Sequence, residues 1–173
     1  MSDEKVPDFS GKDDEKIEQW MRNHETAGAT LTPLYKALAE EAAKRSESKG
    51  LLEIGKSLGA LTEAAEKQLY ITYGDLARAS GVPWSKARHR MNGAKGHLDR
   101  LIDVCHARGL PLLPAICVNE SGRKTGKLEP DALIGFASAA RRIGHLFSDD
   151  QLFHQKCCKE CFAWGLASRT GAS

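Results

Sequence analysis

Hydrophobic residues recur at helical spacing in two consecutive segments in the first half of the chain. Thr32-Pro33 is a typical helix start, with threonine in the N-cap position and proline at the first helical position. The apolar residues that follow return every three or four positions: Leu34, Leu38 and Ala42, and then Leu51, Ile54, Leu58, Leu61 and Ala65. This pattern predicts a helical hairpin within residues 28–70, joined near Gly50. We expect its apolar face, over residues 30–69, to pack on the rest of the chain or on a second copy.

Residues 1–27 are predicted to form a flexible acidic leader, because they are polar and only weakly periodic. A short helix around Asp14–Asn23 would place three larger apolar side chains on one face: Ile17, Trp20 and Met21. The leader therefore has some capacity to form a helix of its own.

The clearest local signals lie between residues 71 and 109. Thr72 is followed three residues later by Asp75, a variant of the capping box that starts a helix. Gly81 is placed to end that helix, and Pro83 can open the next, over Trp84–Met91. A helix, a glycine turn and a second helix form a helix-turn-helix. A third helix follows, with Leu98, Leu101, Ile102 and Cys105 inside and Gly109 at its end.

The second half of the chain adds strand and helix signals. Leu112–Val118 is rich in strand-forming residues, Asn119–Gly122 reads as a turn, and Arg123–Lys127 as a short polar partner strand. These segments predict a β-hairpin with a basic second arm, which would serve as a wing. Two packing helices, about Asp131–Ile143 and Asp149–Trp164, and a tail over 166–173 complete the chain. The predicted fold class is mainly α, with a winged-helix-like domain over residues 71–165.

Composition narrows the class of protein. The chain has 173 residues, of which 41% are hydrophobic and 28% charged, as is ordinary for one soluble globular domain. No apolar run is long enough for a membrane span, and no signal peptide is visible at the N-terminus. Five cysteines, an odd number, do not suggest a disulfide framework. We therefore expect a cytoplasmic protein with reduced thiols and no membrane partner.

Charge is distributed unevenly along the chain. The formal net charge is +2, but residues 1–25 hold eight acids and four bases, whereas residues 78–127 hold ten bases and three acids. A local excess of positive charge is expected of a protein that meets a polyanion such as double-stranded DNA. The candidate DNA-contacting residues come from the predicted helix-turn-helix and wing: Tyr73, Trp84, Lys86, Arg88, Arg90, Lys95, Arg123, Lys124 and Lys127.

Several short motifs between residues 71 and 126 resemble one known family. They are Ile71-Thr-Tyr-Gly-Asp-Leu-Ala, Gly81-Val-Pro, the Leu-Pro and Val-Asn pairs within Leu113–Asn119, and Gly122-Arg123. This arrangement resembles the DNA-binding domain of alkylguanine-DNA alkyltransferases and of the catalytically inactive alkyltransferase-like proteins. The resemblance implies a winged-helix fold and, faintly, recognition of a flipped base. Tyr73 would then help to rotate the target nucleotide, and Arg88 would fill the gap left in the base stack.

The chain departs from that family at the catalytic positions. The family's enzymes carry Pro-Cys-His-Arg, in which the cysteine is the nucleophile and the histidine its base. Here Pro114 is followed by Ala115 and Ile116. The resemblance therefore implies that the chain does not transfer alkyl groups in the family's manner, and we expect no enzymatic activity and no cofactor.

Two further groups of residues are candidates for a metal site and for a catalytic site. His154, Cys157, Cys158 and Cys161 have metal-like composition, but one rigid helix cannot wrap four ligands around one ion, so we expect buried side chains and no metal. His97 or His106 beside Asp99 or Asp103 could serve a nucleic-acid enzyme. No recognised catalytic pattern accompanies these residues.

The sequence therefore predicts a non-catalytic DNA-binding protein, a small regulator or accessory factor with a recognition helix and a basic wing. The alternative is a protein–protein adaptor or a mobile-element interaction protein, in which the winged helix binds a protein partner and residues 30–69 form a homodimer or partner surface. The two differ in salt dependence, because each neutralised phosphate contributes a slope of about 0.9 to log K against log salt.

Overall fold

The computed structural model describes residues 5–171 and consists mainly of helices, as predicted. The α-helices are α1 (Asp14–Thr26), α2 (Pro33–Lys49), α3 (Ile54–Glu66), α4 (Tyr73–Ala79), α5 (Trp84–Met91), α6 (His97–Ala107), α7 (Pro130–Arg142) and α8 (Asp150–Gly171). Two short strands and two 3-10 turns accompany them: β1 (Ile71–Thr72), β2 (Cys117–Val118), η1 (Leu113–Ile116) and η2 (Glu120–Gly122). The outermost parts of the predicted leader and tail, residues 1–4 and 172–173, lie outside the described residues.

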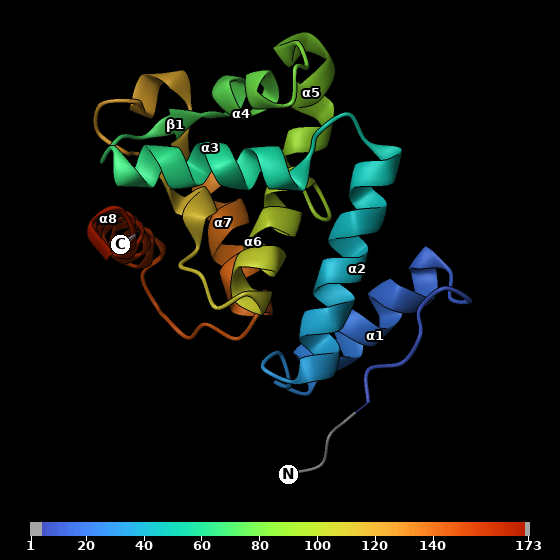
Figure 1. Ribbon diagram of the computed structural model, residues 1–173. Coiled ribbons are helices and arrows are strands. Elements are labelled where there is room, and N and C mark those ends of the chain that lie inside the picture. Colours follow the sequence, from blue (N-terminus) through green and yellow to red (C-terminus); the bar gives the residue numbers. More distant parts are fainter. Residues whose placement is uncertain (1–4, 172–173) are drawn as a thin grey trace.

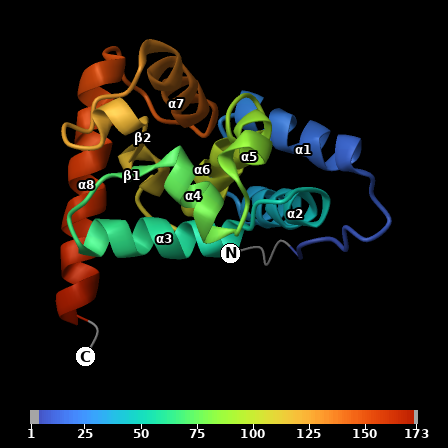
Figure 2. The ribbon, with the colours of Figure 1, turned by 90° about the horizontal axis from the view of Figure 1, so that it is seen from above.

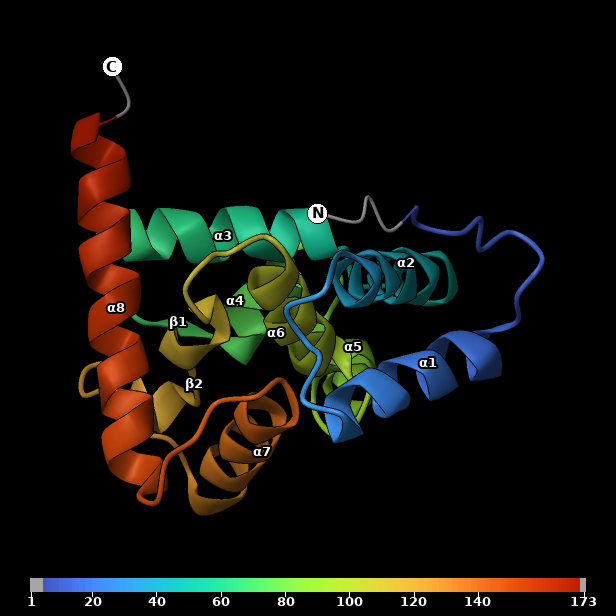
Figure 3. The same ribbon diagram turned by 90° about the horizontal axis from the view of Figure 1, so that it is seen from below.

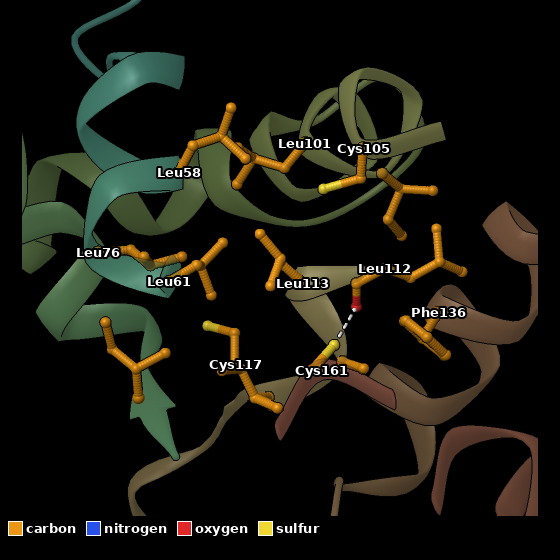
Figure 4. Packing of buried hydrophobic residues seen from close by; sticks show 14 of the residues in the cluster. Leu58, Leu61, Leu76, Leu101, Cys105, Leu112, Leu113, Cys117, Phe136 and Cys161 are labelled. Atoms are coloured by element: carbon orange, nitrogen blue, oxygen red, sulfur yellow. Dashed lines mark hydrogen bonds between the residues drawn. The ribbon is translucent and has the colours of Figure 1, made fainter. Parts of the chain in front are cut away.

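The main hydrophobic core surrounds η1. Leu113 and Ile116 of this turn are fully buried, between side chains from α3, α6, α7 and α8. Figure 4 shows Leu113 between Leu61 and the Cys161 side of the core, where the Cys161 thiol donates a 3.3 Å hydrogen bond to the Leu112 carbonyl. In Figure 3, α8 runs along one side of the molecule and α1 and α2 lie at the opposite side, with α6 between them. Helix α6 therefore lies at the centre of the molecule.

A second, smaller hydrophobic cluster joins α1 to α2. The side chain of Asp13 accepts a 2.8 Å hydrogen bond from the backbone of Lys16 and starts α1. Ile17 and Met21 are buried against Tyr35 and its neighbours on α2. The predicted short helix forms, but the prediction of a flexible leader is wrong for residues 14–26, because their apolar face has a partner.

The two helices predicted between residues 28 and 70 both form, but not as a packed hairpin. Thr32 caps α2 by accepting a 3.2 Å hydrogen bond from the Tyr35 backbone. Beyond Gly50 the chain changes direction, and α2 packs mainly on α6 and α1 while α3 packs on α8 and α4 (Figure 1). The apolar faces of both helices are thus covered within one chain, so their burial does not require a second copy.

The predicted helix-turn-helix elements are present. Both bonds of the capping box form, from the Asp75 amide to Thr72 Oγ1 at 3.2 Å and from the Thr72 amide to Asp75 Oδ2 at 3.0 Å. Gly81 has a φ of 71°. The backbone N–H of the next residue, Val82, donates a 3.0 Å hydrogen bond to the Ala77 carbonyl. This conformation turns the chain from α4 into α5, and it favours glycine because a side chain would be strained there.

The predicted β-hairpin is wrong. Leu113–Ile116 is a 3-10 turn, since Pro114 has no amide hydrogen to donate to a neighbouring strand. Cys117–Val118 does form a strand, but it pairs in parallel with Ile71–Thr72. Residues 123–127 form a turn, closed by a 2.7 Å bond from the Gly126 amide to the Gly122 carbonyl. The chain therefore has no β wing among the residues described.

The two C-terminal helices form close to where they were predicted. Helix α8 continues to Gly171, so the prediction of a tail is wrong for residues 166–171. It crosses α3 at Gly165, where a Cβ atom would overlap the backbone of Ala65. No helix between residues 5 and 171 combines the length and apolarity needed to span a bilayer.

Candidate nucleic-acid interface

Helix α5 is attached to the core along one narrow side. Ala87 and Met91, one helical turn apart, are its fully buried residues. Lys86, Arg88 and Arg90 are exposed and lie around the rest of the helix. Figure 2 looks onto the side of the molecule that carries α4 and α5. The predicted recognition helix is therefore presented to solvent along most of its circumference.

The cations of α5 are free of carboxylates. Lys86 and Arg88 form no ion pair with any described residue, and the only polar partner of Arg88 is the neighbouring His89, at 3.3 Å. The Arg90 guanidinium donates a 3.2 Å hydrogen bond to the Lys49 carbonyl, which is uncharged. Positive charge on this helix is thus not neutralised within residues 5–171, and the side chains are available to phosphate oxygens.

Two aromatic residues connect α5 to the interior. The rings of Trp84 and Tyr73 are stacked, with centroids 6.3 Å apart and an interplanar angle of 15°. Trp84 is 41% exposed, whereas Tyr73 is only 7% exposed, and burial raises the pKa of the Tyr73 hydroxyl. Tyr73, predicted to contact DNA, therefore lies behind Trp84 and not on the outer surface.

Lys95 lies in the loop between α5 and α6 and pairs with α1. Its backbone adopts a φ of 63°, and its amide donates a 3.0 Å hydrogen bond to Asp99. Its ammonium nitrogen lies 3.8 Å from Glu18 on α1. Its charge is partly offset by that acid, and it lines one surface hollow together with His89 and Arg90 of α5.

Arg123, predicted to lie on the wing, binds within the protein. Its guanidinium makes two 2.9 Å bonds to Glu120 and a third of 2.9 Å to Asp75. Burial opposes ionisation of Asp75, but hydrogen bonds from Thr72 and Arg123 outweigh it and hold the pKa of this carboxyl at about 2. Arg123 thus ties the 119–127 loop to the start of α4.

Lys124 and Lys127, the other two cations predicted on the wing, are exposed to solvent. Neither side chain pairs with a carboxylate in the described part of the chain. In Figure 1 the loop that carries them lies along the same edge of the molecule as α4 and α5, although without a wing.

The cysteine-rich stretch of α8 faces the core. His154 Nε2 lies 2.8 Å from the Ala115 carbonyl and 3.4 Å from Cys158 Sγ. Burial raises the pKa of the Cys158 thiol to about 12. Within residues 5–171, no three His, Cys, Asp or Glu side chains are grouped closely enough to hold a metal ion.

The histidines considered for catalysis bind other partners. Buried His97 lies 2.7 Å from the Ser57 hydroxyl, and burial lowers the pKa of its imidazole to about 4. His106 lies 2.7 Å from the Thr30 carbonyl. Asp103 instead faces Arg142, with 2.7 Å between carboxylate and guanidinium. The structure does not bring either histidine together with Asp103.

A cavity of about 690 Å³, which was not predicted from the sequence, lies behind α5. Tyr73 lies in its wall, and the other lining residues come mainly from α6, α7 and the loop between α5 and α6. A signal was present in the sequence, because Asp131, Gly135, Ser138 and Arg142 share one face of α7. A row of polar and small residues on a helix that otherwise packs inward indicates a face turned to solvent, and here that exposed face forms one wall of the cavity.

Comparisons with known proteins give no relative of this chain. No family model, no curated protein and no solved structure matches it. The likeness of residues 71–126 to alkyltransferases therefore stays a prediction, and function has to be argued from the surface itself.

Proposed function

We propose that the protein binds double-stranded DNA through α5 and acts as a non-catalytic regulator or accessory factor. The observation that carries the proposal is the exposed, carboxylate-free pair Lys86 and Arg88 on the second helix of a helix-turn-helix. Helices in this position enter the major groove, while basic side chains around them bind phosphates. Lys124 and Lys127 would add contacts to the DNA backbone from the neighbouring loop.

The absence of catalysis in this proposal depends on the segment after Pro114. Ala115 and Ile116 occupy the positions where the resembling family has its nucleophile and base, and both are fully buried. The next thiol along the chain, Cys117, is also buried, and burial raises its pKa well above the ordinary value, which disfavours the reactive thiolate.

The proposal is tested by the fluorescence anisotropy of labelled duplex DNA at several salt concentrations. Wild-type protein should bind with strong salt dependence, and Arg88→Ala should lower the slope of log K against log salt by about 0.9. Arg169→Ala is the matched control, because it removes an exposed arginine near the far end of α8. Salt-insensitive binding, or equal effects of both variants, would argue against α5 as the DNA surface.

A protein partner is the second candidate for the same surface. Trp84 is 41% exposed beside free arginines, and tryptophan and arginine are enriched among the residues that dominate protein–protein interfaces. If this adaptor function holds, Trp84→Ala abolishes partner capture, the protein binds no duplex DNA at low salt, and added salt changes capture little.

A further inference from the structure

The cavity behind α5 is bounded by two helices and closed on one side by a loop. Helices α6 and α7 form its long walls, Asn92–Ala94 forms one edge, and Tyr73, Pro114 and Cys117 lie on the inner side. Its volume of about 690 Å³ falls within the range of small-molecule sites in proteins. The space is therefore large enough for an organic molecule.

The wall formed by α7 has a gap in its middle. Asp131, Gly135, Ser138 and Arg142 recur at intervals of three or four residues, so they follow one stripe of the helix, and all four line the cavity. Gly135 lies within this stripe and contributes no side chain. A Cβ atom built on it would meet no atom within 4 Å. The cavity thus reaches the backbone of α7 at this point.

The cavity has an excess of negative charge. Three carboxylates line it, Asp99, Glu129 and Asp131, against a single cation, Arg142. The charge of Arg142 is already matched, because its guanidinium lies 3.0 Å from Glu25, 2.7 Å from Asp103 and 4.0 Å from Asp99. Asp131 pairs with no base between residues 5 and 171. A ligand entering this space therefore meets net negative charge.

Most of the remaining wall is apolar, and it includes two uncharged polar side chains, Asn92 and Asn119. Leu98 and Ile102 come from α6, Leu128 precedes α7, and Phe136 lies on α7 beside the polar stripe. These side chains and the Tyr73 ring offer a surface for a hydrophobic body, and aromatic faces also attract cations.

We propose that this cavity is a binding site for an organic cation with an apolar, ring-containing body. The acidic side chains Glu129 and Asp131, which pair with no base in the described chain, select the positive charge, and the apolar walls bury the ring system. An anionic ligand of the same shape is disfavoured by like charge. This site does not depend on the proposed DNA binding, because it uses other residues.

The test uses rhodamine 6G, a cationic xanthene dye, and fluorescein, an anionic xanthene, with the full-length protein. Fluorescence anisotropy should show saturable binding of rhodamine 6G and at least tenfold weaker binding of fluorescein. Asp131→Asn should weaken rhodamine 6G binding several-fold, because it removes an exposed carboxylate without disturbing the core.

Gly135→Leu tests whether the dye occupies the cavity. The new side chain fills open space, and leucine has a better helix propensity than glycine, so the variant should fold while losing dye binding at least tenfold. Gly59→Leu on α3 is the matched control, since a Cβ there also meets no atom within 4 Å and Gly59 lines no part of this cavity. The proposal is overturned if wild-type protein does not bind rhodamine 6G, if fluorescein binds equally well, or if Gly135→Leu binds like Gly59→Leu.

Discussion

Two groups of basic residues in the second half of the chain have opposite surroundings. Lys86 and Arg88 on α5 are exposed and meet no carboxylate in the described structure. Arg100 on α6 and Arg142 on α7 lie on either side of Asp103, whose side chain is 1% exposed. A count of charges along the sequence treats all four as equal contributors to a basic surface. The structure assigns the first pair to solvent and the second to the interior.

The interior pair belongs to a network that joins four helices. Arg142 binds Asp103 at 2.7 Å and Glu25 on α1 at 3.0 Å, and the Tyr35 hydroxyl on α2 donates a 2.8 Å hydrogen bond to the same Glu25. Arg100 completes the network through Glu18 on α1. Burial raises the pKa of Asp103 to about 6, although Arg142 and Arg100 oppose this shift. An arginine that the fold places beside carboxylates therefore stabilises the folded state, whereas an arginine without such neighbours stays available to a ligand.

The largest expected effect follows from removing the interior partner. Arg142→Ala leaves Asp103 and Glu25 without their main cation and should lower the free energy of unfolding by about 3–5 kcal/mol. Arg141→Ala, which removes an exposed ion pair with Asp150 and a cation–π contact with the Phe147 ring, should cost about 0.5–2 kcal/mol. Urea denaturation measures both. Similar losses in the two variants would contradict the distinction between interior and surface arginines.

On α5 we expect a loss of DNA binding with little change in the free energy of unfolding. The double variant Lys86→Ala/Arg88→Ala should lower the salt slope of DNA binding by about 1.8, since two phosphate contacts are lost. Its free energy of unfolding should stay within about 0.5 kcal/mol of the wild-type value, because both side chains are exposed and neither pairs with a carboxylate in the described chain. Anisotropy titrations and urea denaturation of the same preparation check the two halves of this prediction.

A smaller effect is expected when pH is lowered from 6.5 to 4. Burial holds the pKa of His97 at about 4, so its contribution to stability is complete above the unfolded pKa and is lost as pH falls through this window. Asp103 has the opposite effect. Burial raises its pKa in the folded state to about 6, so the folded state takes up this proton before the unfolded state and is stabilised as pH falls. Unfolding free energy should therefore fall more steeply with acid in Asp103→Asn than in wild type, and less steeply in His97→Asn. Parallel pH profiles for the three proteins would refute this assignment.

The smallest effect concerns the loop near α4. Arg123 already binds Glu120 and Asp75, whereas Lys124 binds no carboxylate between residues 5 and 171. Lys124→Ala should therefore weaken DNA binding more than Arg123→Ala, by a few-fold. Arg123→Ala should instead lower the free energy of unfolding by about 0.2–1 kcal/mol, as for other exposed ion pairs. A larger loss of DNA affinity in Arg123→Ala than in Lys124→Ala would contradict this prediction and indicate that Arg123 contacts DNA.

Local chemistry was enough to place most helices. The N-cap of α2 at Thr32, the capping box of Thr72 and Asp75, and the turn at Gly81 appear where they were predicted. These features depend on residues within four positions of one another, and they act wherever the chain lies in the fold. Helical periodicity likewise identified the buried faces of α2, α3 and α6, because apolar side chains leave water whatever covers them.

The partners of those faces and charges depended on contacts between distant segments. Ile71 and Cys117 pair as parallel strands across more than forty residues, a contact that no local pattern marks. Arg123 binds Asp75 across a similar separation, and Arg142 binds Glu25 across most of the chain. The cavity beside Gly135 exists because α6 and α7 enclose it. Which basic residues stay free for a ligand was therefore decided only by tertiary structure, since an ion pair requires two side chains within a few ångströms and sequence separation says nothing of that distance.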